Sequence, residues 1–275
     1  MACHRLFKLI FMEFYAISQG IPVHISDTQK GDVALVLLHG YLETLYIFEE
    51  FEERLSPYVR VISLDLPGHG LTGTKEINTM EFMADVVAGV LDKCNVGDAY
   101  IAGHSMGGYV AQEFIKKYPN RSRGMILLNS TPFADDPQKL HYREREIELI
   151  KKEKLTAIAQ IGIPKMYAPE NLRRFDDKIE ETVENVDAHD PAGIIASIRG
   201  LVSRADNSEF IKTLKGGLMI FGDKDSFIGK ENYEKIISFN PNITSVLLPN
   251  TGHNCFIEEE DKTVGLVLDF MHILP

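Results

Sequence analysis

The segment YIAGHSMGGYVAQEF, residues 100–114, changes from strand-like to helix-like around a single serine. Its first residues are apolar, as in a buried strand, and the later ones place apolar side chains at helical spacing. The turn between them, Gly103 to Gly107, reads GHSMG and matches the pattern G-x-S-x-G. A serine at such a turn is held in a strained backbone conformation, and flanking glycines remove the side chains that would collide there. The segment therefore predicts a strand, a sharp turn and a helix, with the Ser105 hydroxyl raised above the edge of a sheet.

Strand-like and helix-like segments alternate on both sides of this turn. Two alternating segments joined at Gly20 predict an antiparallel hairpin over 14–18 and 21–27. Continuous apolar runs predict buried parallel strands at 33–40, 59–64, 99–104, 124–131, 216–221 and 244–248. Helical spacing of apolar residues predicts helices at 44–56, 79–94, 106–119, 229–239 and 258–274. This order predicts an α/β fold, with a mostly parallel sheet and helices on both faces.

The alternation stops between residues 132 and 210, where the sequence has amphipathic stretches and prolines but no strand-like run. A structureless loop of that length is improbable in a compact domain. We therefore predict a core of residues 12–131 and 211–275, with an all-helical cap inserted over 132–210. Residues 1–11 are interpreted as an N-terminal extension, because their apolar run is short, interrupted by Lys8 and followed by no cleavage site.

Composition narrows the class of protein. The 275 residues carry a formal net charge of −11, so the chain repels polyanions, and no nucleic acid partner is expected. The three cysteines, Cys3, Cys94 and Cys255, are too few and too scattered for a disulfide framework or a zinc site. This pattern suits a reducing cytoplasm. No run is long and apolar enough for a membrane span, so no membrane association is expected.

A serine hydroxyl needs a base to take its proton, and the base needs a carboxylate to orient it. Such groups gather at the carboxyl ends of the strands in an open α/β sheet. His253 follows the strand at 244–248 and is the predicted base. Asp225, after the strand at 217–221, is the preferred acid. Asp223 is less favoured because it can cap its own turn. Asp65 is less favoured because its DLPGHG setting suggests a role in stabilising the loop.

The oxygen of an attacked carbonyl group becomes negatively charged and needs hydrogen-bond donors. The backbone N–H of Met106, directly after the predicted nucleophile, is one expected donor. The second is the N–H of Tyr41, in the loop that follows the strand at 33–38. These two groups form the predicted oxyanion hole.

Together these segments resemble the α/β-hydrolase superfamily, and more narrowly its compact cytoplasmic serine hydrolases or esterases with a helical cap. The resemblance rests on LLHGYLET, DLPGHG, GHSMGG, GDKDSF and TGHNCFIEE, which occur in the expected order between residues 33 and 258. It implies an eight-stranded sheet whose second strand is antiparallel, catalysis through an acyl-enzyme, and no cofactor or metal. The family's roles fall on Ser105 as nucleophile, Asp225 as acid and His253 as base, with Tyr41 and Met106 at the oxyanion hole.

The chain departs from the family pattern in two places. Many members have a proline before the seventh strand, where this chain has Gly216-Gly217. Many also have a proline after the glutamate that follows the catalytic histidine, where this chain has Glu258-Glu259-Glu260. Both differences affect local backbone and remove no catalytic group. A serine nucleophile argues against haloalkane dehalogenases and epoxide hydrolases, which use aspartate at this position.

The cap is expected to supply most of the roof of an apolar substrate pocket. Its predicted lining is Leu42, Phe133, Met166, Tyr167, Ile198 and Phe227. Five arginines are alternative contacts for a carboxylate-bearing substrate: Arg143, Arg145, Arg173, Arg174 and Arg199. For each of these residues, cap core or solvated surface is the competing interpretation.

The leading hypothesis is an ester hydrolase that acts on a small acyl ester or lactone. A small-molecule acyl substrate is the expected partner, and a monomer or homodimer the expected assembly. The alternatives are a C–C bond hydrolase, a lyase-type relative, and a non-catalytic ligand receptor on the same fold. Tyr109 weighs against the menaquinone-pathway synthase type, which usually has an arginine just after its Gly-Gly.

Overall fold

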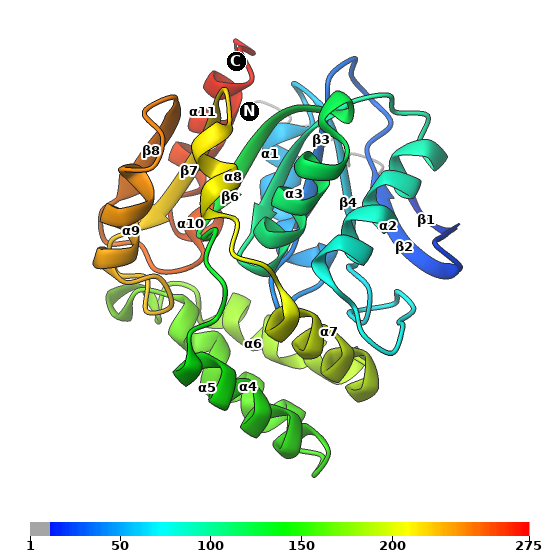
Figure 1. The fold of residues 1–275 in the computed structure, drawn as a ribbon, viewed down its shortest axis with the longest axis vertical. Helices are drawn as coiled ribbons and strands as arrows, with labels where there is room; N and C mark the ends of the chain where they lie inside the picture. The colour runs from blue at the N-terminus through cyan, green and yellow to red at the C-terminus, as the bar shows by residue number, and fades with distance from the viewer. Residues whose placement is uncertain (1–11, 275) are drawn as a thin grey trace, which may run out of the picture.

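One mixed sheet of eight strands forms the centre of the molecule in the computed structural model, which describes residues 12–274 (Figure 1). The extension predicted at 1–11 lies outside the described residues. The strands are β1 (Met12–Ser18), β2 (Ile21–Asp27), β3 (Ala34–Leu38), β4 (Arg60–Leu64), β5 (Ala99–His104), β6 (Ser122–Leu128), β7 (Gly217–Gly222) and β8 (Ile243–Leu248). Their order across the sheet is β1-β2-β4-β3-β5-β6-β7-β8.

β2 is antiparallel to both of its neighbours, and β3 to β8 are parallel to one another. The hairpin between β1 and β2 turns at Gln19 and Gly20, whose φ angles are 50° and 77°. Two consecutive positive φ angles match the twist of a tight hairpin. The α/β class, the mostly parallel sheet and the antiparallel second strand expected from the sequence are all present.

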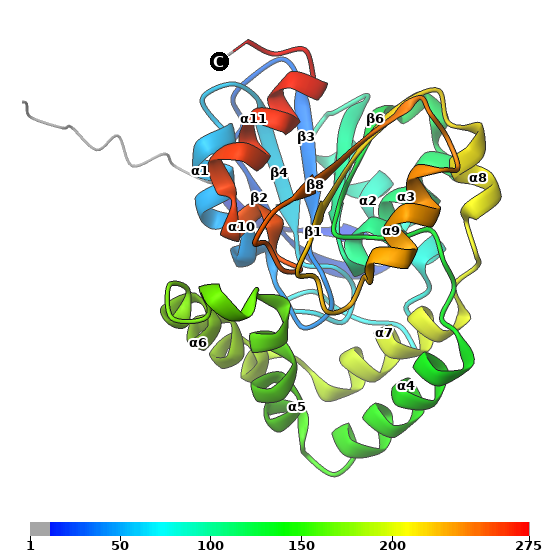
Figure 2. The same cartoon turned by 90° about the vertical axis from the view of Figure 1, so that its left-hand side faces the viewer.

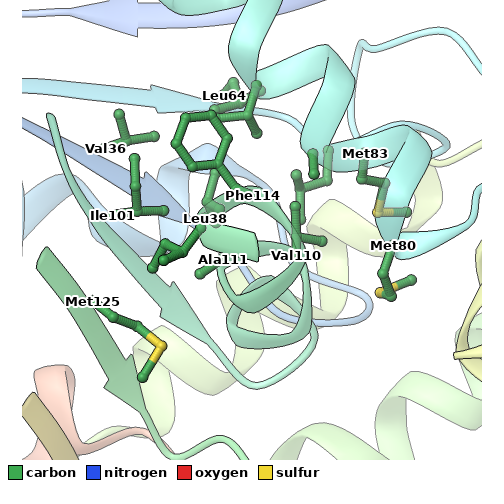
Figure 3. Packing of buried hydrophobic residues seen from close by; sticks show 14 of the residues in the cluster. Val36, Leu38, Leu64, Met80, Met83, Ile101, Val110, Ala111, Phe114 and Met125 are labelled. Atoms are coloured by element: carbon green, nitrogen blue, oxygen red, sulfur yellow. The ribbon is translucent and has the colours of Figure 1, made fainter. Parts of the chain in front are cut away.

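Helices cover both faces of the sheet (Figure 2). One face carries α2 (Met80–Lys93), α3 (Met106–Lys117), α8 (Ser208–Thr213) and α9 (Lys230–Ile237), and the other α1 (Glu49–Leu55), α10 (Cys255–Glu258) and α11 (Glu260–Phe270). Successive residues of the buried strands point to opposite faces, as β geometry requires. Leu38 and Ile101, for example, pack toward Phe114 of α3 (Figure 3), whereas Leu35 and Leu37 join the cluster on the opposite face.

Local signals in the sequence explain where several helices begin and end. The Thr79 side chain caps α2 by accepting the N–H of Phe82. The predicted helix at 44–56 begins as a short 3₁₀ segment, Leu45–Phe48, before α1. The single closing helix predicted over 258–274 is wrong in detail, because the backbone leaves the helical region at Glu259 (φ −128°, ψ 51°) and separates α10 from α11.

The chain between β6 and β7 is helical and contains no strand within the described residues. Its helices α4 (Pro137–Ile150), α5 (Leu155–Gly162), α6 (Asp176–Asn185) and α7 (Pro191–Ser203) gather at one end of the molecule, beyond the sheet (Figures 1 and 2). They bury an apolar cluster of their own, which includes Ile163, Ile194 and Ile198. Throughout residues 12–274, every helix is too short or too polar to cross a lipid bilayer.

Candidate active site

Ser105 lies at the sharp turn between β5 and α3, with a φ of 49° and a ψ of −111°. The Ser105 N–H donates to the Leu128 carbonyl at 3.0 Å, which ties the turn to the end of β6. A Cβ atom on Gly103 would collide with the Gly107 carbonyl, and one on Gly107 would collide with the Leu38 carbonyl. The glycines at 103 and 107 are therefore required by close backbone contact, as the sequence predicted.

The two predicted oxyanion donors lie at the ends of adjacent strands. β3 and β5 pair with Leu38 opposite Gly103, so the loop that holds Tyr41 comes beside the turn that holds Met106. Met106 is the first residue of α3, where backbone N–H groups have no partner inside the helix. Within residues 12–274, neither of these two N–H groups donates a hydrogen bond to another protein group. Both are therefore available to a ligand.

His253 and Asp225 form a buried hydrogen bond after the ends of β8 and β7. The His253 Nδ1 lies 2.7 Å from Asp225 Oδ2, and since a carboxylate only accepts, Nδ1 carries the proton. Burial alone would raise the pKa of Asp225, but His253, the Asn129 amide and the Phe227 N–H hold that pKa below its usual range. The bond leaves the other ring nitrogen of His253 free to accept a proton.

Neighbouring loops fix the position of the His253 ring. The N–H of His253 donates to the Met166 carbonyl of the helical segment at 2.7 Å. The half-exposed ring of Phe227 lies 4.9 Å from the imidazole, centroid to centroid. His253 and Ser105 both line one cavity of about 510 Å³. The predicted nucleophile and base therefore line one cavity, and the predicted acid is hydrogen-bonded to the base, although the three are far apart along the chain.

The alternative acids have other partners. Asp223 accepts the N–H of Thr251, in the loop after β8, at 3.4 Å, and not an N–H of its own turn. Asp65 is buried and accepts the N–H groups of Leu45 and Leu71, and its Oδ2 lies 2.9 Å from Nδ1 of His24. These contacts give Asp65 the loop-stabilising role that its sequence setting suggested.

Asn129, which was not predicted from the sequence, lies directly after β6. Its amide nitrogen donates to Asp225 Oδ2 at 2.9 Å and to the Gly252 carbonyl at 3.1 Å, and its oxygen accepts the Cys255 N–H at 3.3 Å. It therefore joins the loop of the acid to the loop of the base. A buried polar residue directly after an apolar strand was the signal that could have identified it.

A second missed residue is Glu258, which binds the His253 loop to the helical segment. Its carboxylate accepts the N–H groups of Gly252 and Ala168, at 2.7 and 2.9 Å, and the Asn171 side chain at 2.8 Å. Burial raises the pKa of Glu258, although these donors oppose the change. Its position in the FIEE sequence after the predicted base was the available signal.

Of the six predicted pocket residues, Leu42, Met166 and Phe227 line the cavity. The side chains of Tyr167, Ile198 and Phe133 do not line the cavity, because they pack against other parts of the molecule. Tyr167 is buried against Phe175 with ring centroids 5.7 Å apart, and Ile198 is fully buried inside the helical cluster. Phe133 packs on Phe239 beside α9 instead, at a centroid distance of 6.0 Å.

Among the five predicted arginines, Arg143 alone lines the cavity, and the other four are exposed. Arg143 lies 3.4 Å from Asp135 and 3.6 Å from Glu146, and its guanidinium is above the Tyr41 ring. Arg204 also binds Asp135, at 2.6 Å. The charge of Arg143 is therefore already balanced by acids of this chain. No group of three or more histidine, cysteine or acidic side chains in 12–274 is placed to hold a metal ion.

Comparisons with known proteins find several hydrolases that are similar to this chain. A 2-hydroxy-6-oxononadienedioate/2-hydroxy-6-oxononatrienedioate hydrolase of Burkholderia vietnamiensis is 26% identical, over 91% of each chain. A pimeloyl-[acyl-carrier protein] methyl ester esterase of Yersinia enterocolitica is 25% identical, over 88% of this chain and 94% of the relative. The chain also matches the longer Abhydrolase domain-containing protein abhd-5.2 of Caenorhabditis elegans at 24% identity, and spans 59% of its length.

Among solved structures, a thermophilic esterase from Thermogutta terrifontis superimposes with a TM-score of 0.88 at 26% identity, covering 95% of this chain and 98% of that one. A sequence model described as the alpha/beta hydrolase fold matches residues 33–260, which include all five predicted catalytic and oxyanion-hole positions. Strands β3 to β8, the serine turn and the strand-end histidine lie within that matched region. The chain therefore belongs to the alpha/beta hydrolase fold family.

Proposed function

We propose that this protein is a serine hydrolase that cleaves a small, uncharged carboxylic ester or lactone through an acyl-enzyme on Ser105. The observation that carries the proposal is the 2.7 Å hydrogen bond between His253 and Asp225, on a histidine that lines the same cavity as Ser105. A histidine oriented in this way is the base that a serine hydroxyl requires.

In the first step, His253 Nε2 takes the proton of the Ser105 hydroxyl while the serine oxygen forms a bond to the carbonyl carbon. The carbonyl oxygen becomes an oxyanion and accepts the N–H groups of Tyr41 and Met106, each donor contributing about 3–4 kcal/mol in the transition state. The C–O bond to the leaving alcohol then breaks, and His253 returns the proton to that alcohol. Water repeats the sequence, which releases the acid and restores the serine.

Two of the compared proteins support ester chemistry. The Yersinia relative is named a methyl ester esterase, and the Thermogutta structure is that of an esterase. Each covers most of this chain, and each is at least 25% identical to it. A lactone is a cyclic ester, so the same acyl transfer step serves both classes of substrate.

The charges on the cavity wall favour an uncharged acyl group. The charged residues that line the cavity are the acids Asp135, Asp136 and Glu146 and the bases Lys139 and Arg143. Arg143 is paired with two of those acids, so a carboxylate on the substrate would have to compete with buried partners. Bringing a further anion beside them is costly in a site of low dielectric constant.

A C–C bond hydrolase is the second candidate. The Burkholderia relative is named as a hydrolase of 2-hydroxy-6-oxononadienedioate, and it matches over nearly the whole chain. That substrate is a dioate, which carries two carboxylates. The paired state of Arg143 weighs against it, and direct assay separates the two candidates.

Fluorophosphonate labelling tests the proposed nucleophile. Wild-type protein is expected to be labelled and to hydrolyse p-nitrophenyl acetate and butyrate. Ser105→Ala is expected to lose the label and about 10⁴-fold or more of the turnover, because the attacking oxygen is gone. Ser203→Ala removes a hydroxyl that bonds only within its own helix and is the matched control. A labelled Ser105→Ala protein, or a wild type that binds esters without hydrolysing them, contradicts the proposal.

An acyl-charge series tests the proposed substrate class. We expect kcat/KM for p-nitrophenyl pentanoate to exceed that for p-nitrophenyl hydrogen glutarate, which has the same chain length and a terminal carboxylate. The same protein is assayed with 2-hydroxy-6-oxononadienedioate. A kcat/KM for the dioate above that for the pentanoate ester replaces the ester proposal with the C–C hydrolase.

A further inference from the structure

A buried imidazole lies directly before the nucleophile and has an oxygen acceptor at each of its ring nitrogens. His104 has no exposed surface. Its Nδ1 lies 2.9 Å from Glu43 Oε2, and its Nε2 lies 3.0 Å from the backbone carbonyl oxygen of His253. A carbonyl oxygen can only accept, so Nε2 carries a proton. An ionised carboxylate also only accepts, and opposite it Nδ1 must carry a proton too.

The surroundings of Glu43 favour its ionised form. The same oxygen, Oε2, accepts the N–H of Gly40 at 2.6 Å in addition to facing Nδ1 of His104. Burial alone would raise the pKa of Glu43, but His104 and the Gly40 N–H hold that pKa below its usual range. Oε1 has no partner among the described groups, and Glu43 lines a cavity of about 10 Å³, which is the space of one water molecule.

This pair contacts three parts of the proposed active site. Glu43 holds the N–H of Gly40, the residue before the oxyanion donor Tyr41. His104 is the residue before Ser105 in the chain, and its Nε2 donates a hydrogen bond to the backbone carbonyl of the base, His253. An added Cβ on Gly40 would lie 2.8 Å from the Glu43 oxygen and 2.9 Å from the His104 nitrogen, so the packing around the pair is tight.

We propose that Glu43 and His104 form a buried ion pair, with protons on both ring nitrogens of His104, which positions the Tyr41 loop and His253 for acyl transfer on Ser105. The kinetic part of this proposal rests on the proposed function. Glu43 and His104 are positioning residues, because they act on the reaction through Gly40 and His253. The rings of His253 and Phe256 face the pair from the other side, each 5.0 Å from the ring of His104.

The protonation state is tested by ¹⁵N NMR of protein labelled at histidine, with His104 assigned from the signals that His104→Gln removes. At pH 7 the wild type is expected to show both His104 nitrogens in the protonated range. Glu43→Gln, which cannot balance the charge, is expected to leave one of them unprotonated. A wild-type spectrum with a single protonated nitrogen on His104 overturns the ion pair.

The positioning role is tested by ester kinetics. Glu43→Gln is expected to lower kcat by about 10- to 100-fold with KM changed less than about twofold, because small displacements of reacting groups slow the chemical step. Glu43→Asp retains the charge and is expected to recover part of kcat. Glu52→Gln is the matched control, since Glu52 is also buried but lies in α1 and does not line the cavity. An unchanged kcat in folded Glu43→Gln overturns the positioning role.

The two readouts separate this proposal from the proposed function. Absence of ester turnover in the wild type rejects the proposed function, whereas the His104 signals still decide the ion pair. Normal turnover together with a singly protonated His104 rejects the ion pair and leaves the proposed function in place.

Discussion

Ser105 has a backbone conformation that residues with side chains rarely adopt, and the surrounding groups must stabilise it. A positive φ of this kind costs about 1–3 kcal/mol. The Ser105 carbonyl accepts the Ser130 hydroxyl at 2.8 Å and the Gly108 N–H at 3.0 Å, while its N–H binds Leu128. These bonds hold the turn in the one geometry that raises the hydroxyl into the cavity.

Glu52 provides a prediction at the level of one residue. It is 4% exposed, and burial raises its pKa to about 8, above the ordinary value of 4.5. The folded chain therefore binds a proton that the unfolded chain has lost, so the free energy of unfolding falls as pH rises from about 5 to 8. Glu52→Gln stays neutral and is expected to be more stable than wild type by about 2 kcal/mol or more at pH 8, with less difference at pH 5.

Urea unfolding followed by circular dichroism at pH 5 and pH 8 measures this difference. Glu50→Gln is the control, because Glu50 is exposed on the same helix and should give no pH-dependent change. If the gain in Glu52→Gln is the same at both pH values, Glu52 is not protonated in the folded chain.

At the scale of the elements, α7 lies against the loop that precedes α2. The Asn78 N–H donates to the Ala196 carbonyl at 3.1 Å, and the Asn78 side chain lies 3.2 Å from the Ser197 hydroxyl. Gly200, one turn further along α7, touches the same loop. This close contact holds α7 against the loop between β4 and α2.

Gly200→Ala should separate these two elements, because the added Cβ would collide with the Asn78 carbonyl oxygen. We expect a loss of about 1–3 kcal/mol in the free energy of unfolding. Gly265→Ala makes the same change in α11, where nothing lies within 4 Å of the new Cβ, and should instead gain about 0.5–1 kcal/mol. Urea titration of both variants at pH 7 checks this, and equal stabilities would contradict the described contact.

At the scale of the whole molecule, buried carboxylates connect loops from several parts of the chain. Glu43, Asp65, Asp135 and Asp225 all have pKa values below their usual range, against the effect of burial, because cations, histidines and N–H groups surround them. Each binds its proton less tightly when folded than when unfolded. Their stabilising contribution to the free energy of unfolding is therefore complete above about pH 5. It is lost as the pH falls through the pKa values of the folded chain.

The molecule is accordingly expected to lose at least about 2 kcal/mol of its free energy of unfolding between pH 5 and pH 3. Urea midpoints measured at pH 5, 4 and 3 test this. The opposite effect of Glu52 lies mostly above this window, between its ordinary pKa of 4.5 and about 8. A midpoint that stays constant down to pH 3 would mean that these carboxylates are no better stabilised in the folded chain than in the unfolded one.

The sequence alone was sufficient for the α/β class, the order of strands and helices, and the Ser105 turn. These features depend on local signals: the period of apolar residues, the glycines that close contact requires, and the turn residues after each strand. His253 and Asp225 could be selected because parallel strands bring their carboxyl ends to one edge. Their roles in catalysis remain predictions until Ser105 labelling and kinetics are measured.

Only the tertiary structure decided which side chains meet at the cavity. Tyr167 and Ile198 belong to the segment between β6 and β7, yet both are buried in its own apolar cluster and do not line the cavity. Asp135, which faces Arg143, is also bound by Arg204, 69 positions away. Glu43 reaches His104 across 61 positions and Asn129 reaches Asp225 across 96. Such contacts depend on how distant loops pack together, and the local periodicity that defines strands and helices carries no information about them.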